Sequence, residues 1–265
     1  MTSTPHRWTA LVLAGQRPGV DPLAAHFGVD WKALVPVRGE PMVTQVVHTL
    51  NQVAEIDRIV VLAQGPEALR AAVEAGGGAA DILASGDGIS SSILRYVGTL
   101  SDPWPVLVTT ADHPLLTPDM VRHFIAQAET GGGDVAIAMV EQATMLAAYP
   151  DNKRTWLRFR DGAWSGANLF ALRSDRARAA LNLWAVAEQD RKKAWRLFLH
   201  FGPMLALRAV TRTIGLAAAL RHAGRRLGLT AQLVPMPMAE AAIDVDKVSD
   251  HVLAEEILRA RSDQL

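Results

Sequence analysis

The sequence LVLAGQRPGVDPLAAHFGVDWKALVPV, residues 11–37, decides the fold prediction. Its apolar beginning, residues 10–14, predicts a buried strand, and residues 15–19 form a glycine-containing turn. Lys32 follows, just before another apolar segment. A strand that ends in glycine and arginine presents backbone N–H groups and a guanidinium at one edge of a sheet, which suits a polyphosphate. The stretch therefore predicts a nucleoside triphosphate site.

Apolar runs alternate with helical patterns through the next hundred residues. Strands are predicted at 59–63, 106–110, 135–140, 168–172 and 231–236, and helices at 42–53, 67–75, 90–100 and 249–260. Strands that alternate with helices imply a parallel sheet with right-handed crossovers, and ligands gather at the carboxyl ends of such strands. The predicted fold class is α/β, a Rossmann-like three-layer sandwich with a mostly parallel central sheet.

Composition excludes several function classes. The chain has 265 residues with 27 Lys and Arg against 27 Asp and Glu, so its net charge gives no global attraction to nucleic acid. It has no cysteine, which excludes disulfides, thiolate metal sites and thiol nucleophiles. No apolar stretch reaches the length of a membrane span, and no signal peptide is recognisable. We therefore expect a soluble cytoplasmic protein.

Residues 191–226 are strongly basic. They contain no acid and nine basic residues: Arg191, Lys192, Lys193, Arg196, Arg208, Arg212, Arg221, Arg225 and Arg226. The pattern predicts two helices separated at Gly202-Pro203. One interpretation is an ordinary amphipathic surface with Trp195, Phe198, Leu199, Leu205, Leu207 and Leu220 facing the core. The other is a peripheral contact with anionic lipid head groups or with a phosphorylated acceptor.

Four signals stand at predicted strand ends: the turn at 15–19, Lys32, the turn at 86–92, and Asp112. Together they resemble the MobA-like nucleotidyltransferases (NTP transferases). The matching residues are Leu13-Ala14-Gly15, Lys32-Ala33-Leu34 with Gly39, Pro41 and Met42, Gly86 to Ser92, Thr110 to Leu116, and Asp244-Val245-Asp246 with Asp250. The resemblance covers residues 8–140 well and 231–260 loosely. It implies a GT-A type fold and a single domain, 1–265, in which 141–230 elaborate the acceptor side.

The resemblance also implies an activity. Family members transfer an NMP group from CTP, GTP or UTP to a phosphorylated sugar, polyol, lipid precursor or cofactor, with Mg²⁺ present and pyrophosphate released. The catalytic residues carried over are Arg17, Lys32 and Asp112. The residues that the resemblance assigns to nucleotide binding are Leu13, Ala14, Gly15, Gln16, Arg17, Gly19, Lys32, Gly86, Gly88, Ser91 and Ser92. Acceptor binding falls to His113, Arg154, Gly166 and Asn168, and Mg²⁺ binding to Asp112 with Asp246 or Asp244.

These residue types suit the chemistry. A cationic pair such as Arg17 and Lys32 neutralises a triphosphate, and Mg²⁺ needs only one or two carboxylates because it keeps waters and phosphates. The turn at 15–19 departs from the family pattern Gly-Gly-x-x-x-Arg-Met-Gly. Val20 occupies the position of the family arginine, and Pro18 removes one backbone N–H. We expect this loop to be where the protein differs from its relatives.

Two rival functions stay open at the level of sequence. A glycosyltransferase that uses a nucleotide sugar usually carries Asp-x-Asp at the strand end, where this chain has Thr110-Ala111-Asp112. A nucleotide-binding regulator without turnover would fit the altered turn. A dinucleotide dehydrogenase is disfavoured because Gly15-x-x-x-Gly19 is not Gly-x-Gly-x-x-Gly. The base, the acceptor and the oligomeric state are left undetermined.

Overall fold

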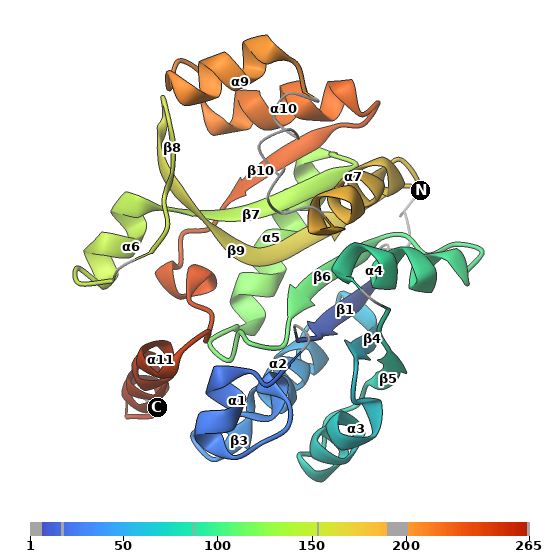
Figure 1. Cartoon of the computed structure of the whole chain (residues 1–265), viewed down its shortest axis with the longest axis vertical. Helices are drawn as coiled ribbons and strands as arrows, with labels where there is room; N and C mark the ends of the chain where they lie inside the picture. Colours follow the sequence, from blue (N-terminus) through green and yellow to red (C-terminus); the bar gives the residue numbers. More distant parts are fainter. Residues whose placement is uncertain (1–6, 17–18, 87, 153, 190–200, 264–265) are drawn as a thin grey trace. The chain divides into compact units, whose positions relative to one another are not determined.

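A computed structural model of the chain describes residues 7–16, 19–86, 88–152, 154–189 and 201–263 (Figure 1). It contains two compact units. Unit 1 comprises Met1–Ser85, Leu107–Arg122 and Ile243–Leu265, and unit 2 comprises Gly86–Val106 and His123–Ala242. The single nucleotidyltransferase domain stays a prediction.

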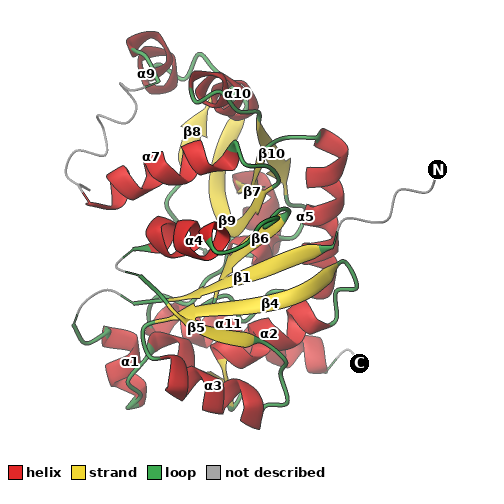
Figure 2. Cartoon of the chain, turned by 90° about the vertical axis from the view of Figure 1, so that its right-hand side faces the viewer, coloured by secondary structure: helices red, strands yellow, loops and turns green. Residues whose placement is uncertain are grey.

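The sheet of unit 1 has the strand order β6-β1-β4-β5. Its strands are β1 (Trp8–Ala14), β4 (Ile56–Ala63), β5 (Asp81–Ala84) and β6 (Val106–Thr110). β1 and β5 both pair with β4 in parallel. The helices α2 (Met42–Asn51) and α3 (Pro66–Ala75) cover one face of this sheet (Figure 2). Continuous apolar strands such as Ile59–Ala63 are buried, as expected for parallel strands that are covered by helices.

The remaining elements of unit 1 hold or flank residues of the candidate site. They are α1 (Pro22–Phe27), the short 3-10 helix η1 (Lys32–Leu34), the hairpin β2 (Pro36–Val37) and β3 (Glu40–Pro41), and the closing helix α11 (Val248–Ser262). The His251 ring nitrogen Nε2 lies 2.7 Å from the Pro36 carbonyl oxygen. This contact attaches α11 to the segment that follows η1.

The sheet of unit 2 has the order β10-β7-β9, with β8 paired to β9. The strands are β7 (Val135–Glu141), β8 (Leu157–Phe159), β9 (Gly162–Leu172) and β10 (Ala231–Pro235). β10 is parallel to β7, whereas β9 is antiparallel to both β7 and β8. The helices of this part of the chain are α4 (Ile89–Gly98), α6 (Gln142–Ala148), α7 (Ala177–Gln189), α9 (Pro203–Val210), α10 (Leu216–Arg226) and the 3-10 helix η3 (Ala239–Ala242). The helix α5 (Pro118–Gly131) begins in unit 1 and ends in unit 2.

The predicted α/β class with a mostly parallel sheet is confirmed. Two details differ from the sequence prediction. The strand predicted at 168–172 is longer, Gly162–Leu172, and antiparallel. The basic segment after Gly202 forms two helices, because Arg212 has a φ of 55° and the Thr211 hydroxyl donates to the Leu207 carbonyl, which ends α9. The predicted helix before Gly202 falls largely on residues 190–200, outside the described residues.

Candidate active site

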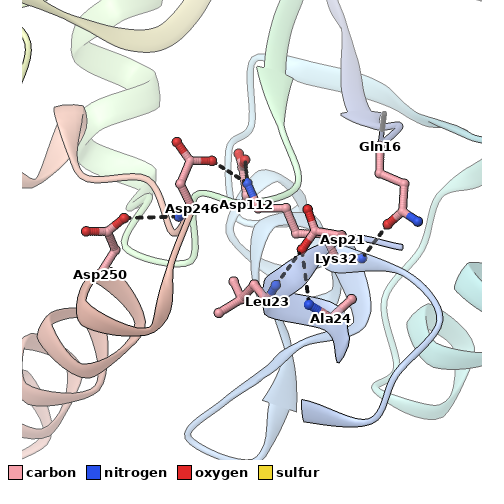
Figure 3. A network of polar contacts seen from close by, with 8 residues as sticks. All are labelled: Gln16, Asp21, Leu23, Ala24, Lys32, Asp112, Asp246 and Asp250. Carbon is pink, nitrogen blue, oxygen red and sulfur yellow. Dashed lines mark hydrogen bonds and ion pairs between the residues drawn. The ribbon is translucent and has the colours of Figure 1, made fainter. Parts of the chain in front are cut away.

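Lys32 lies at the centre of a charged cluster in unit 1. Its Nζ atom donates to Asp112 Oδ2 at 2.6 Å and to Asp246 Oδ1 at 2.5 Å (Figure 3). The Lys32 and Asp112 side chains are mostly buried, whereas that of Asp246 is 66% exposed. Three predicted residues from η1, the loop after β6 and the segment before α11 are therefore in contact. Their catalytic roles stay predictions.

The electrostatics of this cluster keep Lys32 charged. Burial by itself lowers the pKa of Lys32, because an ammonium group loses hydration. The charge of Asp112 and the hydrogen bonds to Asp112 and Asp246 outweigh that effect, and the pKa of Lys32 is raised above its ordinary value. Lys32 thus carries a full positive charge throughout the neutral range.

Backbone hydrogen bonds bring the two carboxylates to this place. The Ala111 N–H donates to the Leu13 carbonyl at 3.0 Å, which holds the loop after β6 beside the end of β1. The Val245 N–H donates to the Asp112 carbonyl at 2.9 Å, so the residue next to Asp246 is tied to Asp112 itself. Asp250 Oδ2 accepts from the Asp246 N–H at 3.2 Å. The arrangement is therefore fixed by main chain as well as by charge.

Gln16 connects the end of β1 to the segment that carries Lys32. Its Oε1 atom accepts from the Lys32 N–H at 3.0 Å (Figure 3). Its Nε2 atom donates to the Asp30 carbonyl at 3.3 Å. Its own N–H donates to Gln64 Oε1 at 3.1 Å. These bonds make Gln16 a positioning residue for Lys32. Gln64 gave no signal in the sequence, because it lies 48 residues away in a separate loop.

The segment between Gln16 and Lys32 contains the helix α1. Asp21 caps this helix, since its Oδ1 atom accepts from the Leu23 and Ala24 N–H groups at 2.9 and 3.1 Å. Gly19 has a φ of 105°, a backbone conformation that residues other than glycine rarely adopt. Gly15, directly after β1, is exposed. Arg17, predicted as a catalytic and phosphate-binding residue, lies outside the described residues, as does Pro18.

The two carboxylates, Asp112 and Asp246, are candidate ligands of a metal ion. Asp112 Oδ1 is buried and accepts no hydrogen bond from the described part of the chain. Among the described residues, no group of three or more His, Cys, Asp or Glu side chains could hold a metal. Two carboxylates nevertheless fit Mg²⁺, which takes few protein ligands and fills its octahedron with waters and phosphates. Of the two candidates for the second ligand, Asp246 is favoured by its contact with Lys32.

In unit 2, the predicted nucleotide-binding turn begins α4. The Gly86 N–H donates to Ser92 Oγ at 2.8 Å, and the Gly88 N–H donates to Ser91 Oγ at 3.0 Å. Both hydroxyls in turn donate to the Gly88 carbonyl. The two serine hydroxyls therefore stabilise the turn itself. Their predicted contact with a base would come in addition to these hydrogen bonds.

Glu188 of α7 contacts the residues that follow this turn, and sequence reasoning missed it. Its Oε2 atom accepts from the Ser90 N–H at 3.2 Å, although the two residues are 98 positions apart. Its Oε1 atom is buried and finds no partner among the described residues. No local pattern marks such a contact, because it depends on the packing of α7 against α4.

The predicted acceptor residues fall in both units. His113 is buried in unit 1, directly after Asp112. Gly166 and Asn168 lie on β9, where the pairing with β7 is interrupted and Asn168 has a φ of 47°. Bulges of this kind occur often beside active sites. Arg154 Nε donates to Ser165 Oγ at 3.4 Å, and Ser165 is the residue on β9 directly before Gly166.

Comparison with known proteins places the chain in a family. The family model described as MobA-like NTP transferase domain matches residues 10–198. A hypothetical transferase from Thermus thermophilus is 31% identical, with a TM-score of 0.77, and the match covers 92% of this chain and 99% of that one. No curated protein sequence matches the chain.

More distant structures share the fold. The 4-diphosphocytidyl-2C-methyl-D-erythritol synthase from Anaerococcus prevotii is 13% identical over 97% of this chain and 100% of its own, with a TM-score of 0.59. The CMP:2-keto-3-deoxy-manno-octonic acid synthetase, solved in complex with CTP, is 14% identical over 98% and 100%, also with a TM-score of 0.59. These likenesses show a Rossmann-like fold of the type used by nucleotidyltransferases. The chain therefore belongs to the family of MobA-like NTP transferase domains, and its enzyme class is that of the nucleotidyltransferases.

Proposed function

We propose that the enzyme transfers an NMP group from an NTP, with CTP as the first candidate, to a phosphorylated small-molecule acceptor in a Mg²⁺-dependent reaction. The observation that carries the proposal is the contact of Lys32 with Asp112 and Asp246, together with Asp112 Oδ1, which accepts no hydrogen bond from the residues that the structure describes. The preference for CTP rests on the synthetase that was solved with CTP and shares the fold.

The reaction forms one bond and breaks one. An oxygen of the acceptor phosphate attacks the α-phosphorus of the NTP, and the bond from the α-phosphorus to the bridging oxygen of the β-phosphate breaks. The bridging oxygen and its electron pair leave with pyrophosphate. Such transfers need little covalent help from a protein, so catalysis consists of positioning and charge neutralisation.

Lys32 is suited to neutralise the triphosphate. An ammonium group has three N–H donors, of which Asp112 and Asp246 take two. The third donor has no acceptor among the described residues, so in this proposal it takes a phosphate oxygen. Gln16 fixes the main chain of Lys32 for this task, and the exposed Gly15, directly after β1, leaves room for a phosphate to approach the backbone.

Asp112 and Asp246 would hold Mg²⁺. The bound ion would supply Lewis-acid stabilisation of charge on the phosphate oxygens. Asp112 contributes the more enclosed carboxylate, and its carbonyl accepts from the Val245 N–H, which joins the two segments that carry the acids. In unit 2 we assign the turn at Gly86, Gly88, Ser91 and Ser92 to the base, and Arg154, Gly166 and Asn168 to the acceptor. His113 of unit 1 keeps the acceptor-binding role that the family resemblance implies.

Pyrophosphate release tests the proposal. Each of CTP, GTP, UTP and ATP is incubated with Mg²⁺ and a panel of phosphorylated sugars, polyols and lipid precursors. We expect release with one NTP and one acceptor class, and none when Mg²⁺ is chelated. NTP binding without release for any pair would favour the regulator, and turnover of a ready-made nucleotide sugar would favour the glycosyltransferase.

Gln16→Ala is expected to lower kcat/KM by about tenfold to a hundredfold, because a displacement of the phosphate-binding lysine by about 1 Å can have that effect. The side chain holds Lys32 through its main chain and not through its charge. Steady-state kinetics of pyrophosphate release measure the change, and Gln52→Ala, at an exposed glutamine of unit 1, is the matched control. Unaltered kinetics in Gln16→Ala would contradict the positioning role.

A further inference from the structure

The helix α9 of unit 2 exposes a stripe of apolar side chains. Met204, Leu207 and Val210 are 65%, 57% and 82% exposed. They are spaced by three residues, which places them along one side of a helix. Leu205 is buried and lies on the opposite side, so α9 packs through Leu205 and leaves the stripe uncovered. The expectation that Leu207 faces the core is therefore wrong.

Five arginines lie on or directly after the same helix, or on its neighbour α10. Arg208 and Arg212 lie in α9 and just after it, and Arg221, Arg225 and Arg226 lie on α10. All five are exposed, and in the described part of the chain none of them forms an ion pair with a carboxylate. The sequence contains no Asp or Glu between Asp190 and Glu240. The positive charge is therefore not neutralised by neighbours along the chain.

The two helices form one surface. α9 and α10 lie side by side in both views of the chain and contact each other (Figures 1 and 2). We define the α9–α10 surface by its exposed members Met204, Leu207, Arg208, Val210, Arg212, Arg221, Arg225 and Arg226. An apolar stripe beside uncompensated cations is the composition of a helix that lies in the interface of an anionic bilayer.

We propose that the α9–α10 surface binds an anionic phospholipid membrane. The arginines contact the phosphate groups, and Met204, Leu207 and Val210 enter the boundary of the acyl chains. A nucleic acid offers the phosphates but nothing for the apolar stripe. A second copy of this chain would bring an equal positive charge, which opposes self-association through the same face. No described helix is long and apolar enough to span a membrane, so the contact is peripheral.

Co-sedimentation of the full chain with lipid vesicles tests this inference. We expect binding to phosphatidylcholine vesicles that contain phosphatidylglycerol, no binding to pure phosphatidylcholine, and weakening at high ionic strength. The triple variant Arg221→Gln, Arg225→Gln, Arg226→Gln should lower the partition coefficient by roughly a hundredfold, since each arginine near an anionic surface contributes roughly fivefold. The triple Arg→Lys variant keeps the charge and should retain binding.

The apolar stripe has its own variant and control. The double variant Leu207→Ser, Val210→Ser is expected to lose vesicle binding by about tenfold or more. Leu157→Ser and Val252→Ser remove exposed apolar side chains elsewhere and should bind as the unaltered chain does. Pyrophosphate release with a water-soluble acceptor should be the same in all these variants, which separates failure of this inference from failure of the proposed function.

Several outcomes would overturn the inference. Absence of vesicle binding at low ionic strength is one, and equal binding to neutral vesicles is another. A third is a stripe variant that converts a dimer into a monomer without any change at vesicles, which would indicate a second copy as the occupant. A fourth is a raised KM for a soluble phosphorylated acceptor in the triple Gln variant without vesicle binding. Binding to nucleic acid but not to vesicles would also refute it.

Discussion

Asp112→Asn is expected to lower kcat/KM for pyrophosphate release by about 10³-fold, which corresponds to about 4 kcal/mol of transition-state stabilisation. The substitution keeps the size and shape of the side chain and removes its negative charge. Asp112 is the more buried carboxylate of the cluster, and its Oδ1 atom has no partner among the described residues. The amide is a much weaker ligand for a hard cation such as Mg²⁺. The loss should therefore fall on the metal-dependent step.

The prediction has a second readout that does not depend on turnover. In the unaltered chain, NTP together with Mg²⁺ should raise the melting temperature more than NTP alone, because binding to the folded state stabilises it. Asp112→Asn should lose the part that depends on Mg²⁺. Asp119→Asn is the matched control, since Asp119 is 83% exposed and pairs only with Arg122 among the described residues. An unchanged rate in Asp112→Asn would remove Asp112 from the metal assignment.

Much of the fold could be predicted from local patterns. Continuous apolar runs marked β1 and β4, and the final strand and helix were expected within a few residues of β10 and α11. Buried parallel strands produce such runs because both of their faces are covered. The antiparallel β8 and the extension of β9 had no comparable signal, since the side chains of β8 are mainly exposed.

The candidate site shows the limit of local reasoning. Lys32 is 80 residues from Asp112 and 214 residues from Asp246, and no spacing rule connects positions so far apart. Their presence in one site was expected only through the resemblance to a family, and the direct contact of Lys32 with the two aspartates was not expected. Gln64 and Glu188 have no place in the motifs quoted, and only the packing of the chain revealed them. The α9 stripe was missed because a helical pattern shows which residues share a face but not which face is covered.

Lys32→Met is the second substitution with a large expected effect, a fall in kcat/KM of about 10²- to 10³-fold, comparable to the loss of one donor to a developing anion. Methionine keeps most of the aliphatic length and removes the charge that faces the triphosphate. Lys32→Arg keeps the charge but changes its geometry from a point to a planar fork, so we expect partial activity. Arg58→Met, which removes the partner of Asp81 from another ion pair of unit 1, should leave the kinetics unchanged.

The stability difference between the unaltered chain and Lys32→Met should depend on pH. The pKa of Lys32 is raised in the folded state, so its contribution to the free energy of unfolding is complete below the unfolded pKa of about 10.4 and is lost as the pH rises through the higher folded value. Urea unfolding of the unaltered chain and of Lys32→Met should therefore differ by a constant amount from neutral pH to about pH 10, and the difference should shrink above it. A difference that grows with rising pH would mean that the pKa of Lys32 is lower in the folded state than in the unfolded state. In that case the two carboxylates would not be what stabilises the charge of Lys32, and the ion pairs with Asp112 and Asp246 would not have the assigned role.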